Sequence, residues 1–274
     1  MDLNRISGRG GTQGQYAAIP VRPKDQAAFT CRLCGDCCRH VEGSILLEPL
    51  DAYNLGRCLC GAGVDSIEDV YERYTHLSML NGVYPIFLLN TRGQDQSCVF
   101  LADGRCGVYE SRPRVCRLYP FTVEPGERGR RFAYYQCLDS HAAHFAGGKV
   151  RIRDWMYRSF TRDARDFVET EASIFPELGK LLEKLGQDGR RHFLFRLLYH
   201  RYYNYELDRP FLPQYRENQR QLIDTLRKEV CRSCMCWNAG RREGPAKAAG
   251  STGNSMPYAA GALRWSGCAW AWAL

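Results

Sequence analysis

Four cysteines stand within eight residues near the beginning of the chain: Cys31, Cys34, Cys37 and Cys38. Cys31 and Cys34 are three positions apart, a spacing at which two sulfur atoms can bind one tetrahedral metal ion. Adjacent side chains diverge, so Cys37 and Cys38 suit two neighbouring metal ions, or a metal ion and a cluster. Gly35 allows the sharp turn that would bring a third sulfur back. The spacing predicts metal or iron–sulfur binding, and a disulfide knot or buried apolar cysteines are the alternative.

Four more cysteines follow downstream: Cys98, Cys106, Cys116 and Cys137. Glycines flank Cys106, where a chain that folds around a metal ion needs unusual backbone dihedral angles. Pro113 and Pro120 fix φ on either side of Cys116. These residues indicate that the second group of cysteines also belongs to a constrained, irregular part of the fold.

Together the motifs resemble the YkgJ-type cysteine-cluster family. The resemblance rests on Cys-x2-Cys-Gly-x-Cys-Cys, then Cys-x-Phe-Leu, then Cys-x-Val-Tyr-Glu-x-Arg-Pro-x-x-Cys-Arg-x-Tyr-Pro-Phe, and it covers residues 31–137. Over the cluster the chain is also similar to the flagellin lysine N-methylase of some bacteria. The family is described as zinc- or iron-chelating, so the resemblance implies eight metal ligands: Cys31, Cys34, Cys37, Cys38, Cys98, Cys106, Cys116 and Cys137.

Eight thiolates could form two four-sulfur sites, an iron–sulfur cluster with one zinc ion, or one cluster with redox thiols left over. Sulfur ligation by itself does not separate zinc from iron. Arginines near the cysteines, above all Arg112 and Arg117, are expected to offset the negative charge of such a site. His40, His141 and His144 could each be a ligand, although a surface position or a hydrogen bond to a ligand is the favoured interpretation.

The remaining cysteines fall outside this pattern. Cys58 and Cys60 are separated by one residue, which is a poor spacing for a tetrahedral pair, and we expect spare thiols there. A third group consists of Cys231, Cys234 and Cys236. These cysteines could bind another metal ion or cap the main cluster, but a structural role is favoured.

Composition and charge restrict the expected location and partners of the protein. The chain has 274 residues, 14 cysteines and a formal net charge of +8. It contains no apolar run long enough to span a membrane and no secretory signal at its beginning, so we expect a cytoplasmic protein whose grouped thiols hold metal. Most of the excess positive charge lies near the two ends, and a nucleic-acid surface is not predicted. The expected partners are metal ions and either a protein substrate or a redox partner.

The elements that must position the cysteines are short and irregular. Residues 1–28 show no periodicity and are predicted to be a disordered leader. Residues 29–145 are predicted to form an irregular cysteine-rich metal-binding module with short strands. A helical region packed on it is predicted for residues 149–236, and a low-complexity tail for residues 237–274. The predicted fold class is therefore α+β.

Two local patterns within the module lead to specific predictions. Ser66 and Asp69 have the spacing of a capping box, and the apolar stripe behind them predicts a helix over residues 66–80. Apolar, strand-forming residues predict a hairpin made of residues 83–90 and 97–100.

Two classes of function fit these observations. The first is a zinc- or iron-chelating protein, or an iron–sulfur protein, whose centre has a structural or redox role. The second is an enzyme whose metal cluster organises a protein-modifying site, by analogy with flagellin lysine N-methylase, although a shared module does not transfer an activity. No catalytic residue can be assigned from the sequence. Full burial of the sulfurs would favour the first class, and an open coordination position would favour the second.

Overall fold

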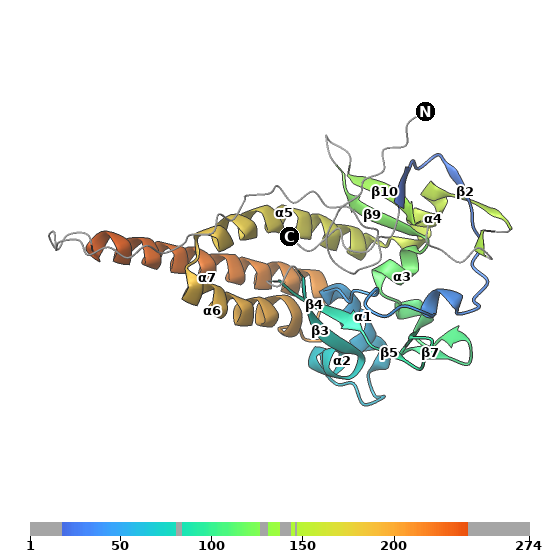
Figure 1. The fold of residues 1–274 in the computed structure, drawn as a ribbon, viewed down its shortest axis with the longest axis horizontal. Coiled ribbons are helices and arrows are strands. Elements are labelled where there is room, and N and C mark those ends of the chain that lie inside the picture. Colours follow the sequence, from blue (N-terminus) through green and yellow to red (C-terminus); the bar gives the residue numbers. More distant parts are fainter. Residues whose placement is uncertain (1–17, 81–83, 127–130, 138–143, 146, 241–274) are drawn as a thin grey trace, which may run out of the picture.

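The structure is a computed structural model that describes residues 18–80, 84–126, 131–137, 144–145 and 147–240. It is an α+β fold in which short strands and helices precede a region of long helices. Figure 1 shows α5 (Arg162–Lys184), α6 (Gln187–Leu197) and α7 (Phe211–Gly240) side by side, projecting away from the part that contains most of the strands. The predicted fold class is confirmed.

The first described residues belong to two small antiparallel sheets. The strands of these sheets are β1 (Ala18–Val21), β10 (Phe132–Cys137) and β9 (Phe121–Pro125) in one, and β2 (Gln26–Ala28) and β11 (Lys149–Arg151) in the other. The prediction of a disordered leader is therefore wrong for residues 18–28, because their backbone groups pair with strands more than a hundred positions away. Residues 1–17 lie outside the described part of the chain.

The capping box at Ser66 is confirmed, but the helix behind it is shorter than predicted. The Ser66 side chain accepts a hydrogen bond from the Asp69 N–H, and the Asp69 carboxylate accepts one from the Ser66 N–H. This helix, α2 (Ile67–Tyr74), ends where β3 (Thr75–Leu80) begins. The prediction of helix over residues 75–80 is wrong, because these residues pair with the apolar strand β4 (Tyr84–Leu89). Pairing with the next strand in the chain here overrides the helical pattern.

That pairing also changes the predicted hairpin. The strand predicted over residues 83–90 is present as β4, but its partner is β3 rather than residues 97–100. The latter contribute only the two-residue strand β6 (Ser97–Cys98), which pairs with β5 (Thr91–Arg92). The other short elements around the cysteines are η1 (Asp36–Cys38), α1 (Pro49–Leu59), β7 (Leu101–Ala102), β8 (Arg105–Cys106), η2 (Tyr109–Ser111) and α3 (Arg114–Leu118).

The helical region after residue 149 is confirmed. It begins with α4 (Ile152–Ser159) and includes the π-helix η4 (Leu198–Tyr203) between α6 and α7, besides the three long helices. The apolar face of α5 packs in one core with α6, α7 and β4, through buried residues that include Leu178, Leu181, Leu197, Leu222 and Leu226. α7 continues to Gly240, into the segment predicted as a tail, and residues 241–274 lie outside the described residues.

Buried side chains join the helices to the cysteine-rich part. The Tyr202 hydroxyl donates a hydrogen bond to the Pro85 carbonyl oxygen over 2.9 Å, and its ring lies edge-on to Tyr71 in α2. Arg201 forms a buried ion pair with Glu171 of α5. These contacts place η4 against both α2 and β4. No helix in the described part of the chain is long and apolar enough to cross a membrane.

Candidate metal centre

A cavity of about 210 Å³ lies between η1, the short strands β6 to β8 and α3. Its lining contains seven of the eight cysteines predicted to be ligands: Cys31, Cys34, Cys37, Cys38, Cys98, Cys106 and Cys116. The eighth, Cys137, is half-buried in β10 and is not among the lining residues. The fold thus brings together sulfurs from both halves of the motif.

Gly35 determines how the first group of cysteines enters the cavity. Its φ is +74°, which side chains other than glycine rarely adopt. A Cβ atom at this position would lie 2.5 Å from the carbonyl oxygen of Gly104 and 2.8 Å from Leu101 Cδ1. The loop can therefore pack directly on the turn between β7 and β8, and Cys106 lies in β8. The Gly35 carbonyl then accepts a hydrogen bond from the Cys38 N–H and begins η1.

Five of the lining cysteines form what we call the central thiol group: Cys37, Cys38, Cys98, Cys106 and Cys116. The Cys38 thiol hydrogen-bonds to the sulfurs of both Cys37 and Cys106, which raises its own pKa. The same hydrogen bonds lower the pKa of Cys37 and lower that of Cys106 to about 6. Three sulfurs are thus linked by hydrogen bonds, at a place where a metal cation could bind several thiolates.

Cys98 and Cys116 complete this group from β6 and α3. Burial raises the pKa of both thiols, and the neighbouring sulfurs raise that of Cys116 further. Ionising them in this setting therefore needs a compensating positive charge, which a bound cation would supply. The donor set consists of five sulfurs, one from a buried and four from half-buried cysteines, and it fits zinc, iron or an iron–sulfur cluster.

Of the two arginines expected to screen this charge, Arg112 lies at the site and Arg117 does not line it. Arg112 lines the cavity, stacks over the Tyr109 ring at 3.6 Å from its centroid, and donates from Nε to the Tyr109 carbonyl oxygen. Its charge adds to the effect of the Cys38 hydrogen bonds in lowering the pKa of Cys37 and Cys106. Arg117 instead lies 3.9 Å from Asp51.

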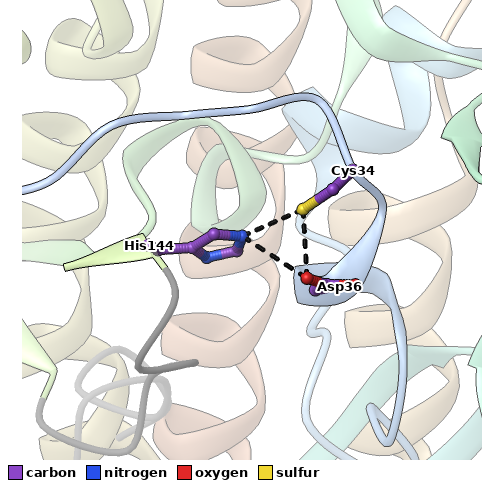
Figure 2. Close-up of side chains that lie close together, drawn as sticks. All are labelled: Cys34, Asp36 and His144. Atoms are coloured by element: carbon purple, nitrogen blue, oxygen red, sulfur yellow. Dashed lines mark hydrogen bonds and ion pairs between the residues drawn. The ribbon is translucent and has the colours of Figure 1, made fainter. Parts of the chain in front are cut away.

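A second group of ligating atoms lies beside the first. Figure 2 shows Cys34, Asp36 and His144 pointing toward one another. Cys34 Sγ lies 3.1 Å from His144 Nε2 and 3.2 Å from Asp36 Oδ2. His144 Nε2 and Asp36 Oδ2 are 4.0 Å apart. Their mutual distances allow these three residues to hold a metal ion. Of the two interpretations favoured for His144, a surface position is wrong, because its side chain is only 4% exposed, whereas its contact with Cys34 fits a hydrogen bond to a ligand.

Electrostatics at Cys34 differ from those of the central thiol group. A hydrogen bond from the Asp36 N–H lowers the pKa of the Cys34 thiol, but burial and the Asp36 carboxylate together raise it above its usual value. Asp36 was not predicted to take part, although it stands inside the cysteine motif. Its position between Gly35 and Cys37 could have indicated a role, because it places a carboxylate in the same turn as the cysteine sulfurs.

The other predicted positions lie apart from the cavity or outside the described residues. Cys31 is at the rim, where its thiol hydrogen-bonds with Tyr109. His40, Cys58, Cys60 and Cys231 are exposed and do not line the cavity. Nothing is described of His141 or of the side chains of Cys234 and Cys236. No disulfide joins the cysteines that the structure describes.

The comparisons with known proteins agree with this geometry. Residues 30–138 match the model of the CxxCxxCC family, whose description is "putative zinc- or iron-chelating domain". The matched part covers the whole central thiol group. No curated protein and no solved structure matches the chain. The relation to flagellin lysine N-methylase stays a prediction.

Proposed function

We propose that this protein binds zinc or iron through the central thiol group, and that the metal holds the cysteine-rich part of the fold together or carries electrons for a redox partner. The observation that supports this most is the convergence of five sulfurs from η1, β6, β8 and α3 on one cavity. Buried apolar cysteines without a common function would not need to meet at one cavity with hydrogen bonds between their sulfurs.

A structural contribution of the metal follows from the elements that carry the sulfurs. β6 and β8 have two residues each, and none of the three residues of η1 is fully buried. Such elements bury too little apolar surface to offset their loss of conformational entropy. Structural zinc sites stabilise folded states by on the order of 10 kcal/mol, which is enough to order them.

The five sulfurs of the central thiol group are the ligands we propose first, with Cys31 at the rim as a further ligand. They can complete one four-sulfur site with a sulfur left over, or an iron–sulfur cluster. Cys137 stays a predicted ligand from the motif. We expect the protein to function in a reducing compartment, because thiols kept reduced remain available to metal.

The experiment is metal analysis with an absorption spectrum on protein purified without air. The Cys38→Ser and Cys106→Ser variants should lose the bound metal, whereas Cys58→Ser, at an exposed thiol away from the cavity, should keep it. Zinc alone would give a colourless protein, and an iron–sulfur cluster would give broad visible absorption with matching iron and sulfide. Full metal content in both cavity variants would contradict the proposal.

A further inference from the structure

We propose that Cys34, Asp36 and His144 form a second metal position, which binds one divalent cation through one sulfur, one oxygen and one nitrogen atom and leaves a coordination position open to a small ligand. This position is distinct from the central thiol group, and it goes beyond the proposed function because its ligands and its open position differ from those of a closed four-sulfur site.

The first argument is the geometry in Figure 2. Three atoms with the separations 3.1, 3.2 and 4.0 Å have a common point from which each is about 2 Å away, close to the length of a zinc–nitrogen or zinc–oxygen bond. The three side chains come from two separate segments of the chain, and their ligating atoms all lie within 4.8 Å of one another. An ion would need only small side-chain adjustments to bind all three.

The second argument is the orientation of the imidazole. His144 Nδ1 lies 3.3 Å from the Tyr119 hydroxyl, so it can donate its proton there and leave the lone pair of Nε2 directed at Cys34 and Asp36. Histidine ligands of metals commonly have such a partner on the other ring nitrogen, which fixes the tautomer. The backbone carbonyl of His144 accepts a hydrogen bond from Thr30, which holds this segment beside the cysteine loop.

The third argument separates a metal ligand from a catalytic nucleophile. A Cys–His nucleophile needs a thiolate, and its acidic or amide partner orients the imidazole from the far nitrogen. Here the Cys34 thiol donates a hydrogen bond to the Asp36 carboxylate, whose negative charge opposes formation of the thiolate. A divalent cation resolves this conflict, because a thiolate and a carboxylate together carry the two negative charges that it neutralises.

The open coordination position follows from the exposure of the two loop residues. His144 is buried, but Cys34 is exposed and the Asp36 side chain is 43% exposed. One side of the position therefore faces water. Three protein ligands leave the fourth site of a tetrahedral ion for water or a small exogenous anion, as in zinc sites that exchange ligands.

The test uses Co²⁺ alone as the probe on the full-length protein. We expect His144→Gln to bind one equivalent less Co²⁺ than the wild type, with the remaining equivalents unchanged. Azide should shift the visible Co²⁺ bands of the wild type and have no effect on this variant. His76→Gln is the matched control, because His76 is an exposed histidine that hydrogen-bonds to Asn90, and it should behave as the wild type.

A second variant keeps the test decisive if His144→Gln does not fold. The Asp36 side chain is 43% exposed and asparagine has nearly the same shape, so Asp36→Asn should fold normally, and it should weaken binding of that one equivalent at least about tenfold. Unchanged Co²⁺ stoichiometry and affinity in the folded variants would overturn the inference. So would equal alkylation rates of Cys34 by iodoacetamide with and without Zn²⁺.

The outcomes also separate this inference from the proposed function. If Cys106→Ser loses metal but keeps the azide-sensitive equivalent, both proposals hold. If His144→Gln binds as much as the wild type while Cys106→Ser loses metal, only the second position fails. If Cys106→Ser keeps all its metal and His144→Gln loses one equivalent, only the central thiol group fails.

Discussion

The guanidinium of Arg114 donates two hydrogen bonds of 2.7 Å to the carboxylate of Glu48, a residue 66 positions earlier in the chain. The Arg114 N–H also donates to Asp51 in the first turn of α1. All three residues are buried. This network fixes the start of α3, the helix that carries Cys116, against the start of α1, and so sets the distance of Cys116 from the other sulfurs.

Removing the Arg114 side chain should destabilise the protein and the centre together. In Arg114→Met, the Glu48 carboxylate is left buried without its partner, and breaking a buried pair in this way costs about 3–5 kcal/mol. The free energy of unfolding in urea measures this loss, and metal content should fall with it. Arg220→Met removes an exposed partner of Glu217 and should change little. Equal stability of the two variants would show that the network does not support α3.

Gly35 and Gly43 provide a matched pair for testing the approach of the cysteine loop. Both have positive φ, +74° and +65°, but a Cβ atom would collide with Gly104 only at Gly35 and would meet nothing within 4 Å at Gly43. Gly43→Ala should cost only the backbone strain of about 1–3 kcal/mol and should keep its metal. Gly35→Ala should in addition move η1 away from Cys106 and lose metal. Metal analysis of the two purified variants decides this, and similar retention would contradict the packing argument.

His200 should make stability depend on pH, away from the metal centre. Burial, and then the charge of Arg196, lower the pKa of His200 below its usual value. The unfolded chain therefore binds the proton more readily, so the contribution of His200 to stability is present above about pH 6.5 and is lost as the pH falls below it. The difference in urea midpoint between the wild type and His200→Gln, measured from about pH 7 to about pH 5, should shrink or reverse toward acid. A constant difference would exclude this effect.

Metal removal should loosen the two parts of the chain unequally. Residues 31–137 depend on short elements linked through sulfurs, whereas α5, α6 and α7 share an apolar core that contains no cysteine among its buried residues. After treatment with a chelator under reducing conditions, limited proteolysis should therefore cut first within residues 31–137. Mass spectrometry of the fragments locates the cuts, and restored resistance on adding Zn²⁺ or Fe²⁺ is the control. First cuts within α5 or α7 would contradict the expectation.

Thiol trapping in intact cells tests the redox state that the proposed function needs. The eight motif cysteines should be found reduced or protected by metal, because a thiolate ligand cannot at the same time be part of a disulfide. Alkylation followed by mass spectrometry reads this directly. Stable disulfide crosslinks among these cysteines would contradict the metal centre and indicate a disulfide framework instead.

Several features could be predicted because they depend on residues close together in the chain. The spacing of the cysteines indicated sulfur ligation, the Ser66–Asp69 pair indicated a capping box, and the stripe around Leu178 and Leu181 indicated a helix with one buried face. Each follows from local geometry, in which side chains three or four positions apart share a helix face or a turn. These patterns were sufficient for the α+β class and for the helical second part.

Only the tertiary structure decided what depends on pairing between elements. Residues 75–80 have a helical pattern but form β3, because pairing with β4 gives their backbone hydrogen bonds against a buried strand. Residues 18–28 have no pattern of their own and are ordered by β10 and β11. His144 lies 110 positions from Cys34 in the chain, and its carbonyl accepts a hydrogen bond from Thr30, just before the cysteine loop. Sequence spacing determines local geometry, whereas contacts such as these depend on how separate elements pack and pair in the folded chain.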